Sequence, residues 1–369
     1  MEFVVSRKEL DRELGVLRSV IDTKPTIEVL AYALVTAKAK SVRMAATNLT
    51  NAHESQALPS AVVATPGVAM LPIGLLSGLV GRMSSDEVRV EASKNVATVT
   101  CGRASARLPL MPVEDFPALP VTAPSLFSLP AAALAAAVQS VSSVLDTASR
   151  VGCRGGHMWL DDGNVALIAN DGHRLSVANL AHAGVEAGDG VSLDASSWRA
   201  LAKWLAIEDA DELIGCGISD RSVAWTSSAR MLICSRLEQS YKDVRGHIEK
   251  GKVVREVSFS ASEMAAALRR HVLVTTLDRR KTLLRLNGIA ATLETDTHVG
   301  RVVDEIPIEG AGEEVCLDFQ TPYLLDAVTA IESDRLTLAY RGGGKHVVLK
   351  SAAAPGAWLG VVMPMGDAK

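Results

Sequence analysis

Aromatic side chains are scarce in this chain, since Phe, Trp and Tyr together make up 4% of its 369 residues. A protein that binds single-stranded nucleic acid by base stacking needs exposed rings, so the composition argues against that class. Positive charge is not in excess either, with 38 Lys and Arg against 42 Asp and Glu and a net charge of -4. This balance excludes a strongly basic nucleic-acid binder. It allows a protein that holds DNA loosely through a few local cations.

Paired cysteines, histidine motifs and long apolar runs are also missing. The 5 cysteines include no CxxC, which argues against a disulfide scaffold or a structural zinc site and fits a reducing cytosol. The histidines form no HxxxH or HExxH motif, so we expect no metal and no other cofactor. The longest apolar stretch, residues 67–80, is interrupted by Pro72 and Gly74 and is too short to span a bilayer. The N-terminus carries charges where a signal peptide is apolar, so we expect a soluble cytoplasmic protein.

An internal repeat is the most informative feature that is present. Residues 3–10, 127–134 and 257–264 each combine a short apolar strand with the start of an amphipathic helix. If Ser6, Pro130 and Ser260 are equivalent, the pattern recurs about every 125 residues. Ser6 and Ser260 suit the N-cap position, and Ser260 with Glu263 forms a capping box. Pro130 suits the first helical position.

A second helix is predicted in each repeat, over residues 71–80, 196–205 and 321–331. Alternating runs such as 87–92 and 336–340 are typical of half-buried antiparallel strands. The sequence therefore predicts an α+β protein of three similar domains, each with two helices packed on antiparallel sheets. We place their boundaries at residues 1–123, 124–251 and 252–369, where a Pro-rich stretch and a charged stretch indicate surface connectors.

No catalytic motif is convincing. Asp171, His173 and Ser176 lie close in sequence, but the chain has no nucleophile elbow GxSxG around a serine. The glycines at 342–344 precede Lys345 without the spacing or the Ser/Thr of a P-loop, so a hairpin turn is the better interpretation. We expect that the protein is not an enzyme.

Four short strings, in order along the whole chain, carry a resemblance to a known family. They are KPT at 24–26, EDFP at 114–117, NDGHRL at 170–175 and VVMPM at 361–365. Together with the threefold repeat, they resemble the bacterial DNA polymerase III beta subunit, the beta sliding clamp. The resemblance implies a head-to-tail homodimer in which six DNA-clamp domains form a ring, with helices lining the hole. It also implies a non-catalytic DNA polymerase processivity factor for DNA replication, which encircles double-stranded DNA without sequence specificity.

The partners implied by the resemblance are DNA polymerase III subunits, the clamp loader and repair or other proteins with a clamp-binding motif. They would dock in a peptide pocket between domains 2 and 3. The matching positions are Arg154, Asn170, Gly172, His173, Arg174, Leu175, Lys242, His247, His346, Val361, Val362, Met363, Pro364 and Met365.

Several of these positions depart from the family pattern and make the predicted pocket more polar. Asn170 stands in place of threonine, and Arg154, Lys242, His247 and His346 replace residues that are apolar or small. An alternative therefore stays open. The chain could be a clamp paralogue that serves as a specialised or drug-tolerant spare clamp, resistant to a peptide antibiotic that binds there.

The resemblance also assigns two other surfaces. The DNA-facing candidates are Lys24, Arg150, Arg199, Lys203, Arg269, Arg279 and Arg280. The dimer-interface candidates are Leu75, Leu79, Arg103, Arg107, Leu108, Val272 and Leu273. The segment expected to face the two arginines, residues 294–301, is less acidic than is usual in the family. We therefore expect a dimer with weaker electrostatic steering.

Overall fold

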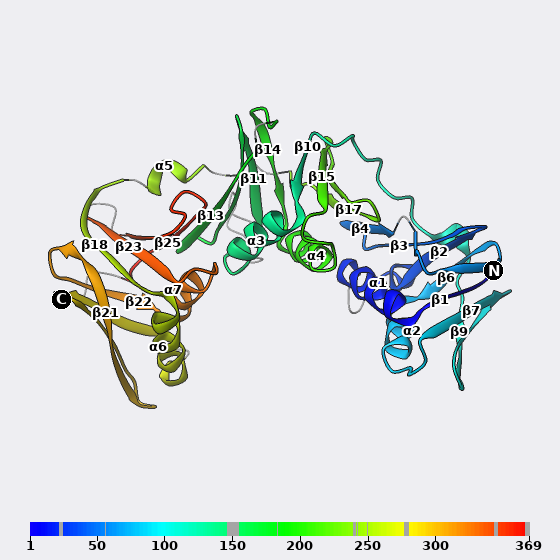
Figure 1. The fold of residues 1–369 in the computed structure, drawn as a ribbon, viewed down its shortest axis with the longest axis horizontal. Helices are drawn as coiled ribbons and strands as arrows, with labels where there is room; N and C mark the ends of the chain where they lie inside the picture. The colour runs from blue at the N-terminus through cyan, green and yellow to red at the C-terminus, as the bar shows by residue number, and fades with distance from the viewer. Residues whose placement is uncertain are drawn as a thin grey trace. The chain divides into compact units, whose positions relative to one another are not determined.

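The computed structural model describes residues 1–21, 25–55, 57–145, 155–182, 184–238, 241, 243–248, 250–276, 280–342 and 346–365. They form two compact units, one of Met1–Ala135 with Ser196–Leu237 and one of Ala136–Ala195 with Glu238–Lys369. Both units consist of antiparallel sheets with helices packed against them (Figure 1), so the α+β prediction is confirmed. No helix in the described part of the chain is both long and apolar enough to cross a membrane.

The first unit contains two antiparallel sheets, with strand orders β5-β1-β7-β8-β9 and β10-β15-β16-β17-β4-β3-β2-β6. Helices α1 and α2 lie side by side, and α1 buries one apolar face that includes Leu10, Leu14 and Leu17 (Figure 1). The elements are β1 (Glu2–Ser6), α1 (Arg7–Val20), η1 (Glu28–Ala31), β2 (Tyr32–Lys38), β3 (Ser41–Thr47), β4 (Asn51–Ser55), β5 (Val62–Thr65), β6 (Gly67–Pro72), α2 (Ile73–Val80), β7 (Glu87–Ser93), β8 (Val96–Cys101), β9 (Ala104–Pro109), η2 (Val113–Asp115), β10 (Phe127–Pro130), α4 (Ala195–Leu205), β15 (Leu213–Ile218), β16 (Ser222–Thr226) and β17 (Arg230–Ser235).

The second unit is built on a long antiparallel sheet of order β14-β11-β12-β13-β25-β24-β23-β18-β21-β20-β19-β22. Helices α6 and α7 pack beside each other, as α1 and α2 do in the first unit. Its elements are α3 (Ala131–Ser142), which begins in the first unit, and β11 (Gly156–Asp161), β12 (Asn164–Asn170), β13 (Arg174–Ala181), β14 (Gly188–Leu193), α5 (Arg245–Ile248), β18 (Lys252–Ser260), α6 (Ala261–Val274), β19 (Lys281–Asn287), β20 (Ala290–Asp296), β21 (Arg301–Gly312), β22 (Val315–Gln320), α7 (Thr321–Val328), β23 (Arg335–Gly342), β24 (His346–Ser351) and β25 (Trp358–Val362).

The predicted repeat is visible in the order of elements. A strand runs directly into a helix at β1–α1, β10–α3 and β18–α6, and the second helices are α2, α4 and α7. The capping predictions are only partly right. The Ser260 hydroxyl accepts from the Glu263 N–H, whereas the Ser6 hydroxyl makes no capping hydrogen bond. Helix α3 begins one residue after Pro130, and α7 ends at Val328 rather than at residue 331.

The sheets cross the predicted domain boundaries. Strands β10 and β15–β17 of the middle segment share a sheet with β2–β4 and β6, because β17 pairs with β4. Strands β11–β14 of the same segment share a sheet with β18 and β23–β25, because β13 pairs with β25. Residues 124–251 thus contribute to both compact units. The division into three domains stays a prediction from the sequence repeat.

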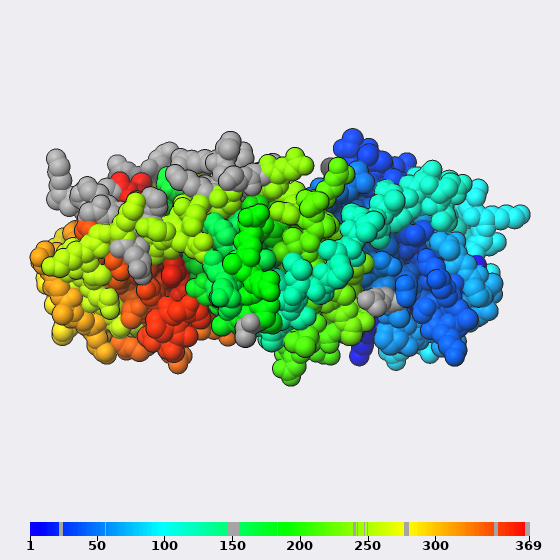
Figure 2. All heavy atoms as spheres, turned by 90° about the horizontal axis from the view of Figure 1, so that it is seen from above, coloured from blue at the N-terminus to red at the C-terminus, as the bar shows by residue number. Residues whose placement is uncertain are grey.

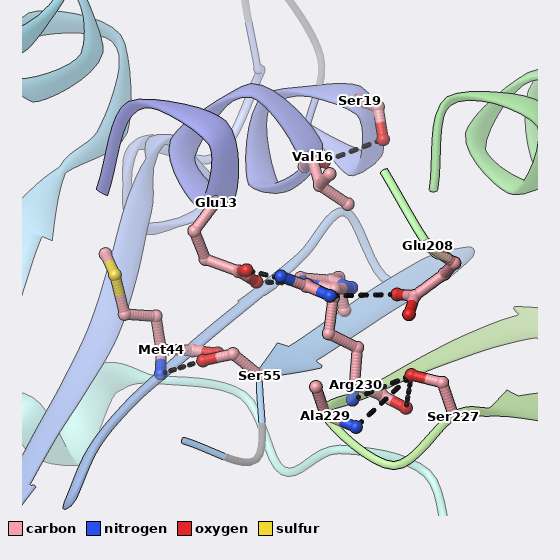
Figure 3. Close-up of polar contacts among 10 residues, drawn as sticks. Glu13, Val16, Ser19, Met44, Ser55, Glu208, Ser227, Ala229 and Arg230 are labelled. Carbon is pink, nitrogen blue, oxygen red and sulfur yellow. Dashed lines mark hydrogen bonds and ion pairs between the residues drawn. The ribbon is translucent and has the colours of Figure 1, made fainter. Parts of the chain in front are cut away.

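A buried ionic network holds the first unit together (Figure 3). The Glu13 carboxylate on α1 lies 2.6 Å from His53 Nε2 on β4 and 2.8 Å from Arg230 Nε on β17. Arg230 also pairs with Glu208, which follows α4, at 3.0 Å. Burial by itself raises the pKa of Glu13, but His53 and Arg230 outweigh it and lower the pKa, so Glu13 is ionised. The network therefore ties the first helix of the chain to a strand of the middle segment.

Candidate functional site

A cavity of about 220 Å³ opens in the second unit where several chain segments meet. They are the β12–β13 loop, the start of β13, the α5 region, the start of β24 and the end of β25. Figure 2 shows the C-terminal segment, in red, at the surface beside green residues of the middle segment. The lining residues are Asn170, Gly172, His173, Arg174, Leu175, Val244, Ile248, Lys250, His346, Val361 and Met363.

Strand pairing gives the cavity a rigid apolar floor. Leu175 on β13 is opposite Val361 on β25, and Val361 is opposite Val348 on β24. The Met363 N–H donates to the His173 carbonyl at 2.9 Å, which extends this pairing past the end of β25. The floor belongs to a buried cluster, so it can receive apolar side chains without rearranging. The cluster comprises Ile168, Leu175, Val177, Tyr241, Ile248, Val348 and Val361.

The loop before β13 is shaped by its own side chains. Asn170 Oδ1 accepts from the Gly172 N–H at 2.8 Å, and Asp171 Oδ1 accepts from the N–H groups of His173 and Arg174. Gly172 has a φ of 87°, a left-handed conformation that favours glycine. The Asn170 amide therefore performs a local structural role in this loop.

Arg174 is the most heavily bonded residue of the cavity wall. Its guanidinium contacts Asp171 at 2.7 Å, Asp326 at 2.5 Å and the Ser143 carbonyl at 2.6 Å, and it lies over the Tyr323 ring at 4.3 Å. Burial lowers the pKa of Arg174, but the two carboxylates outweigh that effect and raise the pKa. Because both carboxylates neutralise it, Arg174 acts mainly to fix the wall.

A second arginine, Arg245, anchors the α5 segment that contributes to the cavity wall. Arg245 on α5 lies over the Trp159 ring at 4.2 Å and pairs with Asp161 at 2.6 Å and with Asp243 at 3.2 Å. The hydrogen bond from Arg245 lowers the pKa of Asp243, burial opposes this effect, and the charges of Arg245 and His157 lower the pKa further. We call the contact set of Arg245, Trp159 and Asp161 the α5 clasp. It positions Val244 and Ile248, which line the cavity.

His346, the first residue of β24, forms a hydrogen bond to this wall. Its side chain is buried, and its Nε2 lies 2.9 Å from the Ile248 carbonyl oxygen. A carbonyl can only accept, so Nε2 carries the proton of this hydrogen bond. The imidazole therefore fills one side of the cavity and fixes the chain that leads to Lys250.

Most of the predicted pocket residues lie around this cavity, although three do not line it. Val362 is fully buried in the sheet, and Pro364 and Met365 follow the end of β25. Arg154, Lys242 and the side chain of His247 lie outside the described residues. Sequence reasoning missed Val244, Ile248 and Lys250, although the apolar residues within the loop at 241–250 were a usable signal.

The predicted DNA-facing cations are on the surface where the structure describes them. Arg199 and Lys203 are exposed on α4, Arg269 is exposed on α6, and Arg280 is exposed just before β19. None of the four forms an ion pair with another described residue, so their charges are available to phosphates. Lys24, Arg150 and Arg279 lie outside the described residues.

The predicted interface residues fall on two separate surfaces. In the first unit, Leu75 on α2 is 57% exposed, Leu79 is half-buried, and Arg103 and Arg107 are exposed beside β9, an edge strand. Leu108 differs, because its side chain is buried within its own unit and leaves only the β9 backbone available. In the second unit, Val272 is half-buried and Leu273 is 79% exposed at the end of α6.

The Asp171, His173 and Ser176 set is a structural arrangement. Asp171 is committed to Arg174, while the buried Ser176 hydroxyl donates to the Ser140 carbonyl and accepts from Trp358 Nε1, both at 2.8 Å. The Ser176 hydroxyl is therefore buried and held by two structural hydrogen bonds. Among the described residues, no cluster of His, Cys, Asp and Glu is arranged to hold a metal ion.

Comparison with known proteins gives concordant matches. Residues 1–120 match the family of the DNA polymerase III beta subunit N-terminal domain. The chain is 24% identical to the beta sliding clamp of Synechococcus elongatus over 377 residues, covering 99% of each.

Two solved structures share the fold over nearly the whole chain. The beta subunit of Streptococcus pyogenes DNA polymerase has a TM-score of 0.89 at 18% identity, covering 99% of this chain and 100% of that one. A sliding clamp from Pseudomonas aeruginosa, solved bound to griselimycin, has a TM-score of 0.88 at 19% identity and covers 99% of each chain.

Proposed function

We propose that this chain, which matches the DNA polymerase III beta subunit family over residues 1–120 and is similar to a beta sliding clamp over its length, is a non-catalytic processivity factor, a sliding clamp that encircles duplex DNA. Two copies would close head to tail, and polymerase, loader and repair proteins would dock by linear peptides in the cavity of the second unit. The observation that carries the docking proposal is the apolar floor of Leu175 and Val361, bordered by the anchored guanidinium of Arg174.

The charge distribution supports a topological link to DNA. A closed ring need not bind tightly, so a net charge of -4 is no obstacle. The exposed cations on α4 and α6 can interact with DNA phosphates across water and ions, without sequence-specific contacts to the bases. Binding of this kind is sensitive to salt, whereas retention by a closed ring on circular DNA is not.

Two sheet edges support the dimer proposal. Strand β9 ends the sheet of the first unit. In the second unit, the pairing between β18 and β21 covers only the C-terminal part of β21. Residues 301–307 of β21 therefore lie beyond β18 and pair with β20 on their other side. Strand addition between such edges would bring the exposed Leu75 of one copy near Leu273 of the other.

The pocket supports partner docking and leaves room for a changed partner set. The Pseudomonas aeruginosa clamp is described as bound to griselimycin, which shows that a clamp of this fold can hold a ligand. In this chain His346 fills one side of the cavity, so the shape of the slot is its own. This observation favours the second candidate function, a paralogue that acts as a specialised or drug-tolerant clamp.

Light scattering at several concentrations is the first experiment. We expect a species of about twice 38.9 kDa. Clamp loaded on nicked circular DNA by a loader should stay bound in high salt and slide off after the circle is linearised. A monomer at micromolar concentration, or equal loss from both DNA forms, would contradict the ring. Equal affinity of an ordinary clamp-binding peptide for this chain and for a relative would contradict the specialised paralogue.

A further inference from the structure

A second cavity lies in the first unit, on strands that take no part in the cavity described above, here called the docking cavity. It measures about 380 Å³ and lies between residues 113–119, which we call the strap, and strands β2, β3 and β4. The strap belongs to the segment that leads from β9 to β10 (Figure 1). Glu54 lines the cavity, whereas its neighbour His53 contacts Glu13 on α1. Because adjacent strand residues point to opposite faces, the cavity lies on the side of this sheet that faces away from α1.

The strap segment is held at its two ends rather than along its length. Just before the strap, Met111 forms an antiparallel bridge with Met70 on β6. Further along, the Leu126 N–H donates to the Cys216 carbonyl at 2.8 Å. Between these points, no N–H group of residues 117–123 donates to another described residue. The segment therefore keeps unused donors beside the cavity, while its prolines restrict the backbone.

Charged side chains of both signs line the cavity without partners. Lys38 on β2 and Arg43 on β3 are exposed, and Glu54 on β4 is half-buried. None of the three forms an ion pair with another described residue. Glu114 and Asp115 in the strap are exposed and do not line the cavity. Two cations and one carboxylate thus remain available to a ligand.

The strand register separates the two signs of charge. Lys38 and Leu34 lie on one face of β2, four residues apart, which is about 13 Å along a strand. Leu34 is opposite Ala45 on β3, and Ala45 is opposite Glu54 on β4, so Glu54 belongs to the Leu34 end. Leu34 and the half-buried Phe116 supply apolar surface from the sheet and from the strap. An extended peptide places its first, third and fifth side chains on one face over the same length.

We propose that this cavity, the strap groove, binds an extended peptide segment of a partner protein in which an acidic, an apolar and a basic residue alternate with other residues. Lys38 and Arg43 pair with the acidic side chain and Glu54 with the basic one. The unused N–H groups beside the groove are donors for the peptide backbone. A nucleic acid is disfavoured, because its phosphates would meet the Glu54 carboxylate at one end. The site is separate from the docking cavity and does not depend on it.

Fluorescence anisotropy on the full-length protein tests the proposal. The parent peptide is labelled and end-blocked, with Asp, Leu and Lys at alternate positions and alanine or serine between them. Two comparison peptides replace Asp by Asn or Lys by Gln, and each replacement should weaken binding about 2- to 5-fold. An unlabelled peptide with leucine and phenylalanine anchors, chosen for the docking cavity, should not displace the parent peptide.

Matched variants connect each preference to one end of the groove. The double variant Lys38→Gln with Arg43→Gln should abolish the Asp-over-Asn preference and keep the Lys-over-Gln preference. Glu54→Gln should do the reverse. The controls Lys8→Gln and Glu91→Gln should change neither preference, because both residues are exposed and neither lines the cavity. Circular dichroism of each variant confirms that it is folded.

The outcomes separate this proposal from peptide docking in the second unit. Absence of binding, equal affinities of the three peptides, or preferences that persist in the groove variants would overturn the proposal. Displacement by the anchor peptide would overturn it too, by placing the parent peptide in the docking cavity. Displacement by a single-stranded oligonucleotide, without a Lys-over-Gln preference, would replace the peptide by a phosphate ligand. Failure of the anchor peptide to bind would count against the docking proposal alone.

Discussion

At Arg230, one guanidinium compensates two buried carboxylates, Glu13 and Glu208. Such an arrangement adds little net stability over an apolar core of the same shape, but removing one member leaves charges buried without a partner. The network is therefore a vulnerable point of the first unit.

Replacing this guanidinium should destabilise the protein strongly. We expect Arg230→Met to lower the free energy of unfolding of the first unit by about 3–5 kcal/mol, measured by urea denaturation. Arg221→Met, at an exposed position before β16, is the control and should change it by less than about 0.5 kcal/mol. Similar losses in the two variants would show that Glu13 and Glu208 tolerate their burial in another way.

His271 should make stability depend on pH. Its ring is buried beside Thr295 and Asp304, and burial lowers its pKa, with Arg270 acting in the same direction against Asp304. Below the ordinary histidine value of about 6.5, the unfolded chain takes up a proton that the folded chain refuses. Stability should therefore fall as pH decreases from about 6.5.

The variant His271→Asn should flatten this part of the stability curve, measured by urea denaturation at successive pH values. His298→Asn is the matched control, since His298 is exposed. An unchanged slope in His271→Asn would place the pH dependence elsewhere.

Single residues were predictable where a local motif marked them. Asn170 to Leu175 form one loop and one strand start, so their proximity follows from the sequence alone. The two partners of Arg230, Glu13 and Glu208, come from two other segments of the chain, and no local pattern brings them together. No local pattern joins Arg245 on α5 to its partner Trp159 on β11 either.

At the scale of elements, two helices that begin alike are capped differently. The α6 N-terminus has the Ser260 hydroxyl as a cap, whereas α1 has no side-chain cap. In both helices the first N–H donates to an aspartate carbonyl, that of Asp334 for α6 and that of Asp86 for α1. We expect Ser260→Ala to weaken amide hydrogen-exchange protection in the first turns of α6, by about 1 kcal/mol, and Ser6→Ala to leave α1 nearly unchanged. Equal effects would mean that the hydroxyl of Ser260 is not a cap in solution.

The α5 clasp should control peptide affinity from behind the cavity. Arg245→Ala removes the Trp159 stack and the Asp161 pair and frees the wall that carries Val244 and Ile248. We expect peptide affinity to fall about 5- to 10-fold by anisotropy, with the solution mass unchanged. Undiminished affinity would show that this wall does not contact the peptide.

Element types were largely predictable, because period-2 alternation and the strand-to-helix pattern persist through the repeat. Helix ends were not, since they depend on partners outside the helix. The sheet to which each strand belongs was not predictable either. The alternation in β17 marks a strand, but nothing in it says that β4 is its neighbour.

At the scale of the whole molecule, the proposed ring depends on a small apolar contact. Leu273→Asp places a charge on the exposed end of α6, and we expect light scattering to show a species of 38.9 kDa in place of the dimer. Ile289→Asp is the control, because Ile289 is 84% exposed in the β19–β20 turn, away from the proposed contact. A dimer in Leu273→Asp, or a monomer in both variants, would contradict this interface.

The sheets that cross the repeat boundaries limit how such a chain can be recombined. Residues 124–251 supply β17 to one sheet and β13 to another, so each sheet has strands from two repeats. A chimera that exchanged this repeat for that of a distant relative would have to match both pairing strands, β4 and β25, together. Although the sequence reads as three copies of one module, the middle copy is therefore not an interchangeable part, because its strands complete the sheets of both neighbours.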